Sequence, residues 1–133
     1  MKINTVVNHL NLSEDLGSLV AMVKPFRWKL FQVKEVIGQN DKQFAEIAIS
    51  VTEFEDFVAR NRKLVPTSVY VVPETADDIT GSYAMIAPNG CFFDNASGLH
   101  HYSRPIQDVG VFEAFNDVAF DVSKFVKRGG SYE

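Results

Sequence analysis

The stretch of residues 25–32 (Pro-Phe-Arg-Trp-Lys-Leu-Phe-Gln) constrains the fold of this chain most strongly. Aromatic and apolar residues alternate with polar ones at the period of two that is typical of a β-strand. On such a strand Arg27 and Lys29 point to one face, whereas Trp28 points to the other. Burying unpaired charge is costly, so a face with two cations has to meet carboxylates, water or an anionic ligand.

A second strand over residues 2–8 repeats this pattern, with Lys2 and Asn4 on one face. Between the two strands, leucines and valines recur at helical spacing, and Pro25 ends the helix that they predict. A strand, a helix and a strand with short connections form a βαβ unit, whose two strands are parallel. We therefore expect the basic residues of both strands to converge on an anion, most simply a phosphate chain.

The starts of two helices are indicated by capping boxes. Asn11 with Glu14, and Thr52 with Glu55, have the spacing at which two side chains satisfy free backbone N–H groups at a helix start. The first helix is expected to bury Leu12, Leu16, Leu19, Val20 and Val23, and the second Phe54, Phe57 and Val58.

The second half of the chain is expected to be antiparallel. Asn89-Gly90 stands between two alternating runs, residues 82–87 and 91–95, which is the strongest short signal of a β-hairpin. Residues 44–49 fit a strand or a helix. The other expected elements are a strand over 68–72 ended by Pro73, an acidic loop over 74–81, a polar loop over 97–105 with His100 and His101, a helix capped by Asp108, and a last turn over 122–125 capped by Asp121.

Two groups of basic residues are candidates for binding an anion, and each has a structural alternative. Arg27 and Lys29 could bind phosphate, or they could pair with carboxylates on the sheet face. The run 127–130 (Lys-Arg-Gly-Gly) combines two cations with glycines that let backbone N–H groups approach an oxygen. The alternative is an ordinary helix end, in which basic residues of the last turn are followed by glycine.

No metal site is predicted. His100 and His101 are adjacent, so they would point to opposite faces of a strand, whereas metal-binding pairs are spaced by two or four residues. Asp77 and Asp78 could hold Mg²⁺ with a nucleotide, although an acidic surface loop fits the same pattern. Cys91 is expected to be a small buried side chain.

Composition narrows the function classes. The 133 residues suffice for one domain with a core, and the net charge of −4 argues against nucleic acid or an anionic membrane as a partner. No apolar run is long enough to span a bilayer, and no signal peptide is visible. The single cysteine excludes an intrachain disulfide and an all-cysteine metal site. A cytoplasmic setting is the simplest expectation.

Taken together, several stretches resemble viperin-like radical S-adenosylmethionine enzymes. The matches keep their order over nearly the whole chain, and the most specific are Arg27-Trp28-Lys29 and the Lys-Arg-Gly-Gly run. The stretches that carry the resemblance are residues 2–8, 14–15, 25–32, 53–57, 72–74, 82–83, 108–114 and 125–132.

The resemblance implies a partial (β/α) barrel with a C-terminal extension. In this family three cysteines of a Cys-x-x-x-Cys-x-x-Cys motif hold a [4Fe–4S] cluster, which cleaves S-adenosylmethionine to a radical. The substrate is a nucleoside triphosphate, typically CTP, which loses water to give a chain-terminating didehydro nucleotide in antiviral defence.

The resemblance also implies roles for individual residues. Tyr83 matches a tyrosine near the reacting sugar, which suggests a catalytic role. The residues that would contact the triphosphate or its surroundings are Lys2, Asn4, Arg27, Lys29, Lys127, Arg128, Gly129 and Gly130.

The family's three cluster-binding cysteines have no counterpart in this chain, and a whole (β/α)₈ barrel takes about 250 residues. The expected fold is therefore α/β: the C-terminal portion of a partial (β/α) barrel over residues 1–66, then an extension over 67–133 with an antiparallel hairpin and a C-terminal helix, within a single domain. On this view the missing N-terminal half is a partner, and the chain alone is not catalytic.

Two other hypotheses stay open. The chain could be a non-enzymatic module that binds a nucleotide or another anion. It could also be a truncated product that self-associates through an exposed barrel edge.

Overall fold

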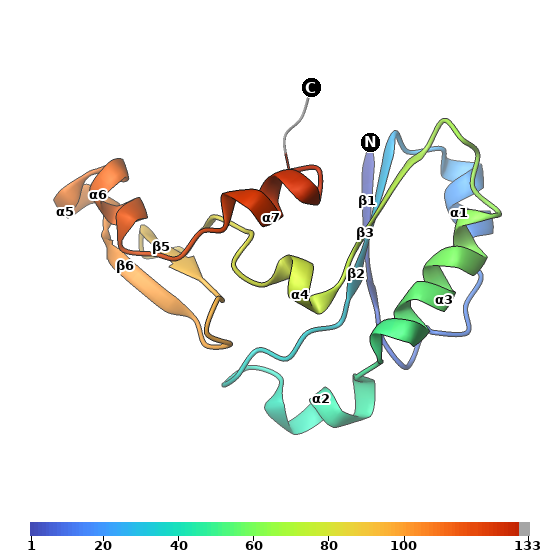
Figure 1. The fold of residues 1–133 in the computed structure, drawn as a ribbon, viewed down its shortest axis with the longest axis horizontal. Coiled ribbons are helices and arrows are strands. Elements are labelled where there is room, and N and C mark those ends of the chain that lie inside the picture. The colour runs from blue at the N-terminus through green and yellow to red at the C-terminus, as the bar shows by residue number, and fades with distance from the viewer. Residues whose placement is uncertain (131–133) are drawn as a thin grey trace. The chain divides into compact units, whose positions relative to one another are not determined.

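The computed structural model describes residues 1–130, which form two compact units (Figure 1). The first unit comprises residues 1–34 and 42–77, and the second comprises 35–41 and the chain from 78 onward. Each unit contains one three-stranded sheet, parallel in the first and antiparallel in the second. The predicted α/β class is confirmed at this level.

The sheet of the first unit consists of β1 (Lys2–Val7), β2 (Arg27–Gln32) and β3 (Tyr70–Glu74), in that spatial order. Both strand pairs are parallel, as the βαβ pattern predicted for the first pair. The register places Lys2 opposite Arg27, and Asn4 opposite Lys29. Because paired residues of neighbouring strands point to the same face, the basic side chains of β1 and β2 share one face of the sheet.

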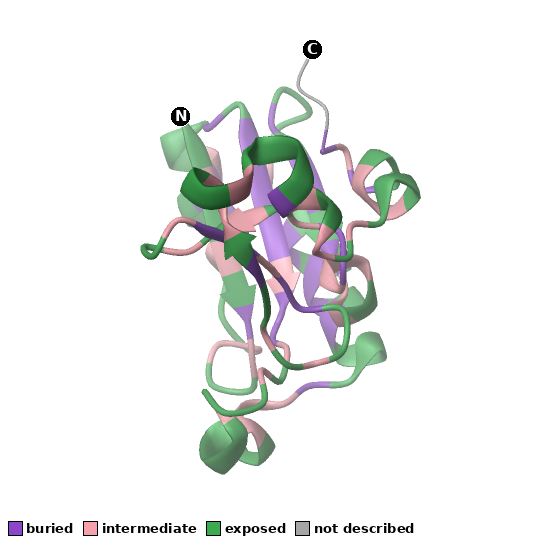
Figure 2. Cartoon of the chain, turned by 90° about the vertical axis from the view of Figure 1, so that its left-hand side faces the viewer, coloured by how far each residue is buried: buried purple, intermediate pink, exposed green. Residues whose placement is uncertain are grey.

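The opposite face of this sheet forms the hydrophobic core with the helices. Figure 2 shows buried segments along the strands and exposed outer surfaces on the helices. Trp28 is fully buried in this core, where its indole N–H donates to Thr5 Oγ1 at 2.9 Å. The other fully or nearly fully buried core side chains are Val7, Leu30, Phe54 and Phe57.

Helix α1 (Leu16–Val23) starts later than the sequence suggested. Asp15 is its N-cap and accepts from Ser18 N at 3.0 Å, so the prediction of a box with Asn11 and Glu14 was wrong. Asn11 instead closes the turn after β1, because its side chain bonds Asn8 N and Val6 O.

The buried face of α1 also differs from the prediction. Val20 is buried, whereas Leu19 and Val23 are exposed. The reason lies at Gly17, where a Cβ atom would clash with the backbone of Asn61. Close approach to α3 centres the buried face on Gly17 and Val20 and turns the side of α1 with Leu19 and Val23 outward.

Helix α2 (Asp41–Ile47) resolves the ambiguous stretch 44–49 largely in favour of helix. Helix α3 (Val51–Arg62) buries Phe54, Phe57 and Val58, as predicted. Its capping box, however, is formed by Ser50 and Glu53.

The box predicted with Thr52 and Glu55 was therefore displaced by two residues. Ser50 Oγ accepts from Glu53 N at 3.2 Å, and Glu53 Oε2 accepts from Ser50 N at 2.8 Å. Both residue pairs have the required spacing, but the helix begins at Val51, so Thr52 lies inside it.

Strand β3 continues through Pro73, which was expected to end it. Pro73 lies opposite Leu30 of β2, and β3 pairs with no second strand among the described residues. An edge strand tolerates proline because the missing N–H can face away from the ladder. The prediction of a loop over 74–81 was therefore wrong for most of its length, because Glu74 belongs to β3 and residues 76–79 form helix α4 (Ala76–Ile79).

In the second unit, β4 (Met85–Ile86), β5 (Cys91–Asp94) and β6 (His101–Pro105) form an antiparallel sheet. The Asn-Gly hairpin is confirmed, although its first strand is shorter than expected. The polar loop predicted over 97–105 was wrong in its second half, because His101 to Pro105 pair with β5.

The helices of the second unit are short. The helix predicted from Asp108 is instead split into α5 (Ile106–Val109) and α6 (Val111–Asn116) by Gly110, whose φ is 85°. Asp121 caps α7 (Val122–Lys127), as predicted, and accepts from Lys124 N. Across residues 1–130, every helix is too short or too polar to cross a lipid bilayer.

Candidate functional site

One face of the parallel sheet carries half of the residues predicted to bind phosphate. The strand register brings four of them together, two from β1 and two from β2. We call this surface the polar sheet face and define it by Lys2, Asn4, Arg27, Lys29, Tyr70 and Glu74.

Lys29 forms an ion pair with Glu74 in the interior of the protein. Lys29 Nζ lies 2.6 Å from Glu74 Oε1, and both side chains are buried. The structural alternative for Lys29, pairing with a carboxylate, is therefore present. Glu74 was missed because Pro73 was expected to end the strand; the period of two counted from Tyr70 would have placed it on this face.

Arg27 is buried, and its guanidinium carbon lies 5.1 Å from the centre of the Tyr70 ring. Lys2 is exposed, and its ammonium lies 5.9 Å from the Phe26 ring. The polar sheet face thus carries three cations and one carboxylate. This excess of positive charge can attract an anion, and Asn4 adds an amide donor.

The polar sheet face extends along the whole length of the strands. Lys2 and Arg27 stand at the amino ends of β1 and β2, whereas Glu74 stands at the carboxyl end of β3. Gln32, at the carboxyl end of β2, is buried and links the segment before α3 to the start of α4, because it donates to Ile49 O and accepts from Ala76 N. Sequence reasoning gave Gln32 no role, and its hydrogen bonds indicate that it holds these segments.

Tyr83 and Arg128 meet in the second unit. The guanidinium carbon of Arg128 lies 3.7 Å from the centre of the Tyr83 ring, and its Nη2 donates to Ser82 O at 2.7 Å. Arg128 is buried and forms the C-cap of α7. The sequence gave no sign of this contact, because the two residues lie far apart in the chain.

The remainder of the Lys-Arg-Gly-Gly run has the geometry of a helix end. The N–H groups of Gly129 and Gly130 donate to Val126 O and Phe125 O, at 3.0 and 2.9 Å. The exposed Lys127 lies 3.7 Å from Asp78 Oδ1. The backbone of residues 127–130 thus has the ordinary helix-end conformation that was the alternative to a phosphate-binding loop. Tyr132, which contributed to the resemblance, lies outside the described residues.

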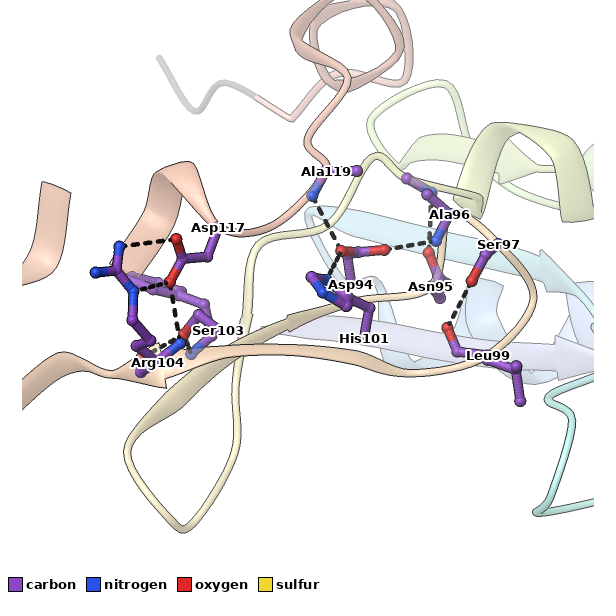
Figure 3. Close-up of polar contacts among 12 residues, drawn as sticks. Asp94, Asn95, Ala96, Ser97, Leu99, His101, Ser103, Arg104, Asp117 and Ala119 are labelled. Atoms are coloured by element: carbon purple, nitrogen blue, oxygen red, sulfur yellow. Dashed lines mark hydrogen bonds and ion pairs between the residues drawn. The ribbon is translucent and has the colours of Figure 1, made fainter. Parts of the chain in front are cut away.

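The carboxylate of Asp94 connects three parts of the second unit (Figure 3). It accepts from Ala96 N at 2.9 Å and from Ala119 N at 3.0 Å, and it lies 3.3 Å from His101 Nδ1. Burial raises the pKa of Asp94, but these hydrogen bonds outweigh burial, so the pKa is lowered overall.

A second carboxylate in Figure 3 fastens β6 to the residue after α6. Asp117 accepts from Arg104 Nε at 2.8 Å and from Arg104 Nη2 at 2.9 Å. The side-chain hydrogen bonds from Arg104 lower the pKa of Asp117 from 3.8 to about 2. These two networks give the second unit its polar framework.

The described residues do not fit a metal cluster. Residues 1–130 contain no group of three His, Cys, Asp or Glu side chains arranged to hold a metal ion, and Cys91 is buried. His100 packs against Phe93, with ring centres 4.9 Å apart, whereas His101 contacts Asp94.

Comparison with known proteins gives a consistent result over the whole chain. No family model matches the sequence. The chain is 44% identical to an S-adenosylmethionine-dependent nucleotide dehydratase of Lacinutrix mariniflava over 99% of its own length and 27% of that protein. It is also 44% identical to the enzyme of that name from Flammeovirga pacifica, over 100% of the chain and 44% of the relative.

A relative from Psychrobacter lutiphocae with the same name is 36% identical over 96% of this chain and 41% of its own length. The chain thus spans less than half the length of these curated relatives. The names state dependence on S-adenosylmethionine and a nucleotide substrate for the relatives. The resemblance is confirmed: along its whole length this chain is a homologue of one part of the S-adenosylmethionine-dependent nucleotide dehydratases.

Proposed function

We propose that this chain is the nucleoside-triphosphate-binding C-terminal part of a viperin-like radical S-adenosylmethionine enzyme. The observation that carries the proposal is the polar sheet face, where neighbouring strands align Lys2 with Arg27 and Asn4 with Lys29. Charge-assisted hydrogen bonds from several cations suit the oxygens of a triphosphate. The names of the relatives support a nucleotide as the substrate.

In this proposal residues 1–66 end a partial (β/α) barrel and residues 67–133 form its extension. Strand β1 pairs only with β2 among the described strands, so its other edge is open to a further strand. Helix α1 contacts α3 through Gly17, while Leu19, Met22 and Val23 leave another side of α1 apolar and exposed. An additional strand and helix would cover both surfaces, as parallel sheets require.

The proposed roles can be stated for each unit in turn. In the first unit Lys2, Asn4, Arg27 and Lys29 bind the triphosphate. In the second unit Tyr83 acts near the reacting sugar, and the run 127–130 contributes to binding. The favoured substrate is CTP, which loses water to give a chain-terminating didehydro nucleotide that acts in antiviral defence.

The [4Fe–4S] cluster and S-adenosylmethionine are assigned to the remainder of the longer protein, because the described residues do not fit a cluster. When bound there, they supply the radical chemistry. The contribution of this chain is to bind the nucleotide and to orient its sugar, and this chain alone is expected not to be catalytic.

Calorimetric titration of the chain with CTP, UTP, ATP and tripolyphosphate in the presence of Mg²⁺ tests the binding proposal. Heat is the preferred readout, because Trp28 faces the core and not the polar sheet face. Two exposed lysines provide a test and a matched control. Lys2→Ala changes the polar sheet face, whereas Lys42→Ala changes α2. Loss of one charge-assisted contact lowers affinity about tenfold, so we expect this only for Lys2→Ala.

Equal loss of affinity in the two variants would indicate non-specific attraction and would contradict the proposed site. The same titration of the protein extended upstream is part of the test. Absence of saturable heat in both proteins would leave the polar sheet face with a structural role only.

Self-association is a second candidate property, favoured by the open edge of β1 and the apolar side of α1. An unpaired strand edge can join the same edge of a second copy.

A further inference from the structure

Helix α7 fastens the short segment that leads to Tyr83, and it does so at both of its ends. At its N-cap, Asp121 N donates to Gly81 O at 2.8 Å. At its C-cap, Arg128 Nη2 donates to Ser82 O at 2.7 Å. Figure 1 shows α7 in red, with α4 and the yellow segment that follows it nearby.

The backbone of this segment is held from its other side as well. Gly81 N donates to Asn95 Oδ1 at 2.9 Å, and Ser82, which is fully buried, donates through its hydroxyl to Asp78 O at 2.5 Å. The two residues before Tyr83 are therefore fixed in place. What their bonds leave undetermined is the rotation of the Tyr83 side chain about its own bonds.

Arg128 contacts the Tyr83 ring directly. Its guanidinium carbon lies 3.7 Å from the centre of the Tyr83 ring, which is contact distance for a planar group over an aromatic face. Tyr83 is only partly buried, so one side of its ring remains accessible to solvent. A lysine in place of Arg128 would keep the charge but lose the flat stacking surface.

We propose that Arg128 is a positioning residue for Tyr83, which holds the phenol ring in the orientation needed for reaction at the nucleotide sugar. The inference rests on the proposed function, which gives Tyr83 its catalytic role. Stacking uses the face of the guanidinium and leaves in-plane N–H groups for other bonds. Arg128 can therefore contact a phosphate while it holds Tyr83, and so links nucleotide binding to the orientation of the ring.

Fluorine NMR of the chain labelled with fluorotyrosine tests the positioning step without any activity. The chain has four tyrosines, and the resonance lost in Tyr83→Phe identifies Tyr83. We expect Arg128→Lys to move this resonance toward the position of free fluorotyrosine, because the ring loses its stacked partner. Lys127→Gln, which alters the neighbouring exposed cation, should leave the resonance in place.

A folding control accompanies this measurement. The tyrosine resonances other than that of Tyr83 should be unchanged in Arg128→Lys, since lysine can still donate to Ser82 O. If the Tyr83 resonance keeps its position in Arg128→Lys, or if every tyrosine resonance collapses with it, the positioning role is refuted.

Kinetics of the longer, cluster-containing protein test the catalytic consequence. Activity of the wild-type protein on a nucleoside triphosphate decides the proposed function first. Given that activity, we expect Arg128→Lys to lower kcat at least tenfold at saturating nucleotide. Adding Arg128→Lys to Tyr83→Phe should lower kcat little further, because both changes act on one unit.

A rise in KM with unchanged kcat in Arg128→Lys would overturn the inference and make Arg128 a phosphate ligand only. Additive losses of kcat in the double variant would overturn it as well. An inactive wild-type protein would instead refute the proposed function, while the NMR result would still decide whether Arg128 orients Tyr83.

Discussion

The ion pair between Lys29 and Glu74 is the residue-level feature with the largest energetic consequence. Both side chains are buried, and their charged atoms are 2.6 Å apart. Removing one partner of such a pair leaves a buried charge, which typically costs about 3–5 kcal/mol, whereas replacing both by apolar residues is often neutral. Loss of one partner is therefore expected to destabilise the fold far more than replacement of the whole pair.

We expect Glu74→Gln to lower the free energy of unfolding by about 3 kcal/mol or more, because the buried Lys29 ammonium then loses the carboxylate 2.6 Å away. The double variant Lys29→Met with Glu74→Leu should recover most of this loss. Urea unfolding at pH 7 measures both values. A loss below about 1 kcal/mol in Glu74→Gln would mean that other groups balance Lys29.

Asp117 gives the second unit a defined response to acid. Its pKa is lowered from 3.8 to about 2 in the folded chain, chiefly by the side-chain bonds from Arg104. A lowered carboxyl pKa contributes stability that is fully present above pH 3.8 and is lost as the pH falls through 2. We expect Asp117→Asn to be less stable than wild type at pH 7, with most of this difference lost near pH 2, measured as the midpoint of urea unfolding.

Glu113→Gln serves as the control for this prediction. Glu113 lies 4.0 Å from the same arginine but is exposed, so its removal should change the midpoint little at either pH. A difference between wild type and Asp117→Asn that persists near pH 2 would contradict the assignment to the ionised carboxyl.

At the scale of single elements, helix starts show how accurately local sequence predicts where a helix begins. The spacing of the capping box predicted that a helix begins near residue 52, and α3 does begin at Val51. Two pairs satisfy the spacing, Ser50 with Glu53 and Thr52 with Glu55. Which pair forms the cap depends on which helical turn packs against the core. That packing is set by residues distant in the sequence.

The two pairs provide a matched test. Ser50→Ala removes the acceptor of Glu53 N and should lower the free energy of unfolding by about 1 kcal/mol. Thr52→Ala changes an exposed residue inside the helix and should stay within about 0.5 kcal/mol of wild type. Chemical unfolding measures both. A larger loss for Thr52→Ala would mean that the cap lies where the sequence first indicated it.

Other elements show the same division between local and tertiary control. The Asn89-Gly90 hairpin and the Asp121 cap were predicted because their signals are local. The extent of β3 was not, because proline is allowed at an edge strand and edge position is a property of the whole sheet. The cations of the polar sheet face were predicted because their alternation is a local pattern. Glu74 and the contact of Arg128 with Tyr83 were not predicted, because they depend on how distant segments pack.

At the scale of the whole molecule, the first unit has both an exposed apolar surface on α1 and an open strand edge on β1. Leu19 and Met22 on α1 are 55% and 81% exposed, and β1 has one strand neighbour among the described residues. Exposed apolar residues and an unpaired strand edge each favour association with another chain. In the longer protein we expect the preceding strand and helix to cover this surface.

We expect the chain by itself to self-associate, so its sedimentation coefficient should rise with protein concentration. Leu19→Glu combined with Met22→Glu should reduce this rise, because the added charges would have to be buried at the interface. Val122→Glu, at an exposed position on α7, is the matched control and should sediment like wild type. Concentration-independent sedimentation of wild type would contradict the prediction.

The spatial order of β1, β2 and β3 is the same as their order along the chain. Each strand therefore pairs with the strand made just before it, and no later segment has to be inserted between two strands that have already paired. Such a sheet can assemble vectorially while the ribosome is still at work. Pairing of β1 with β2 closes a shorter stretch of chain than pairing of β2 with β3, so we expect the addition of β3 to be the slower step.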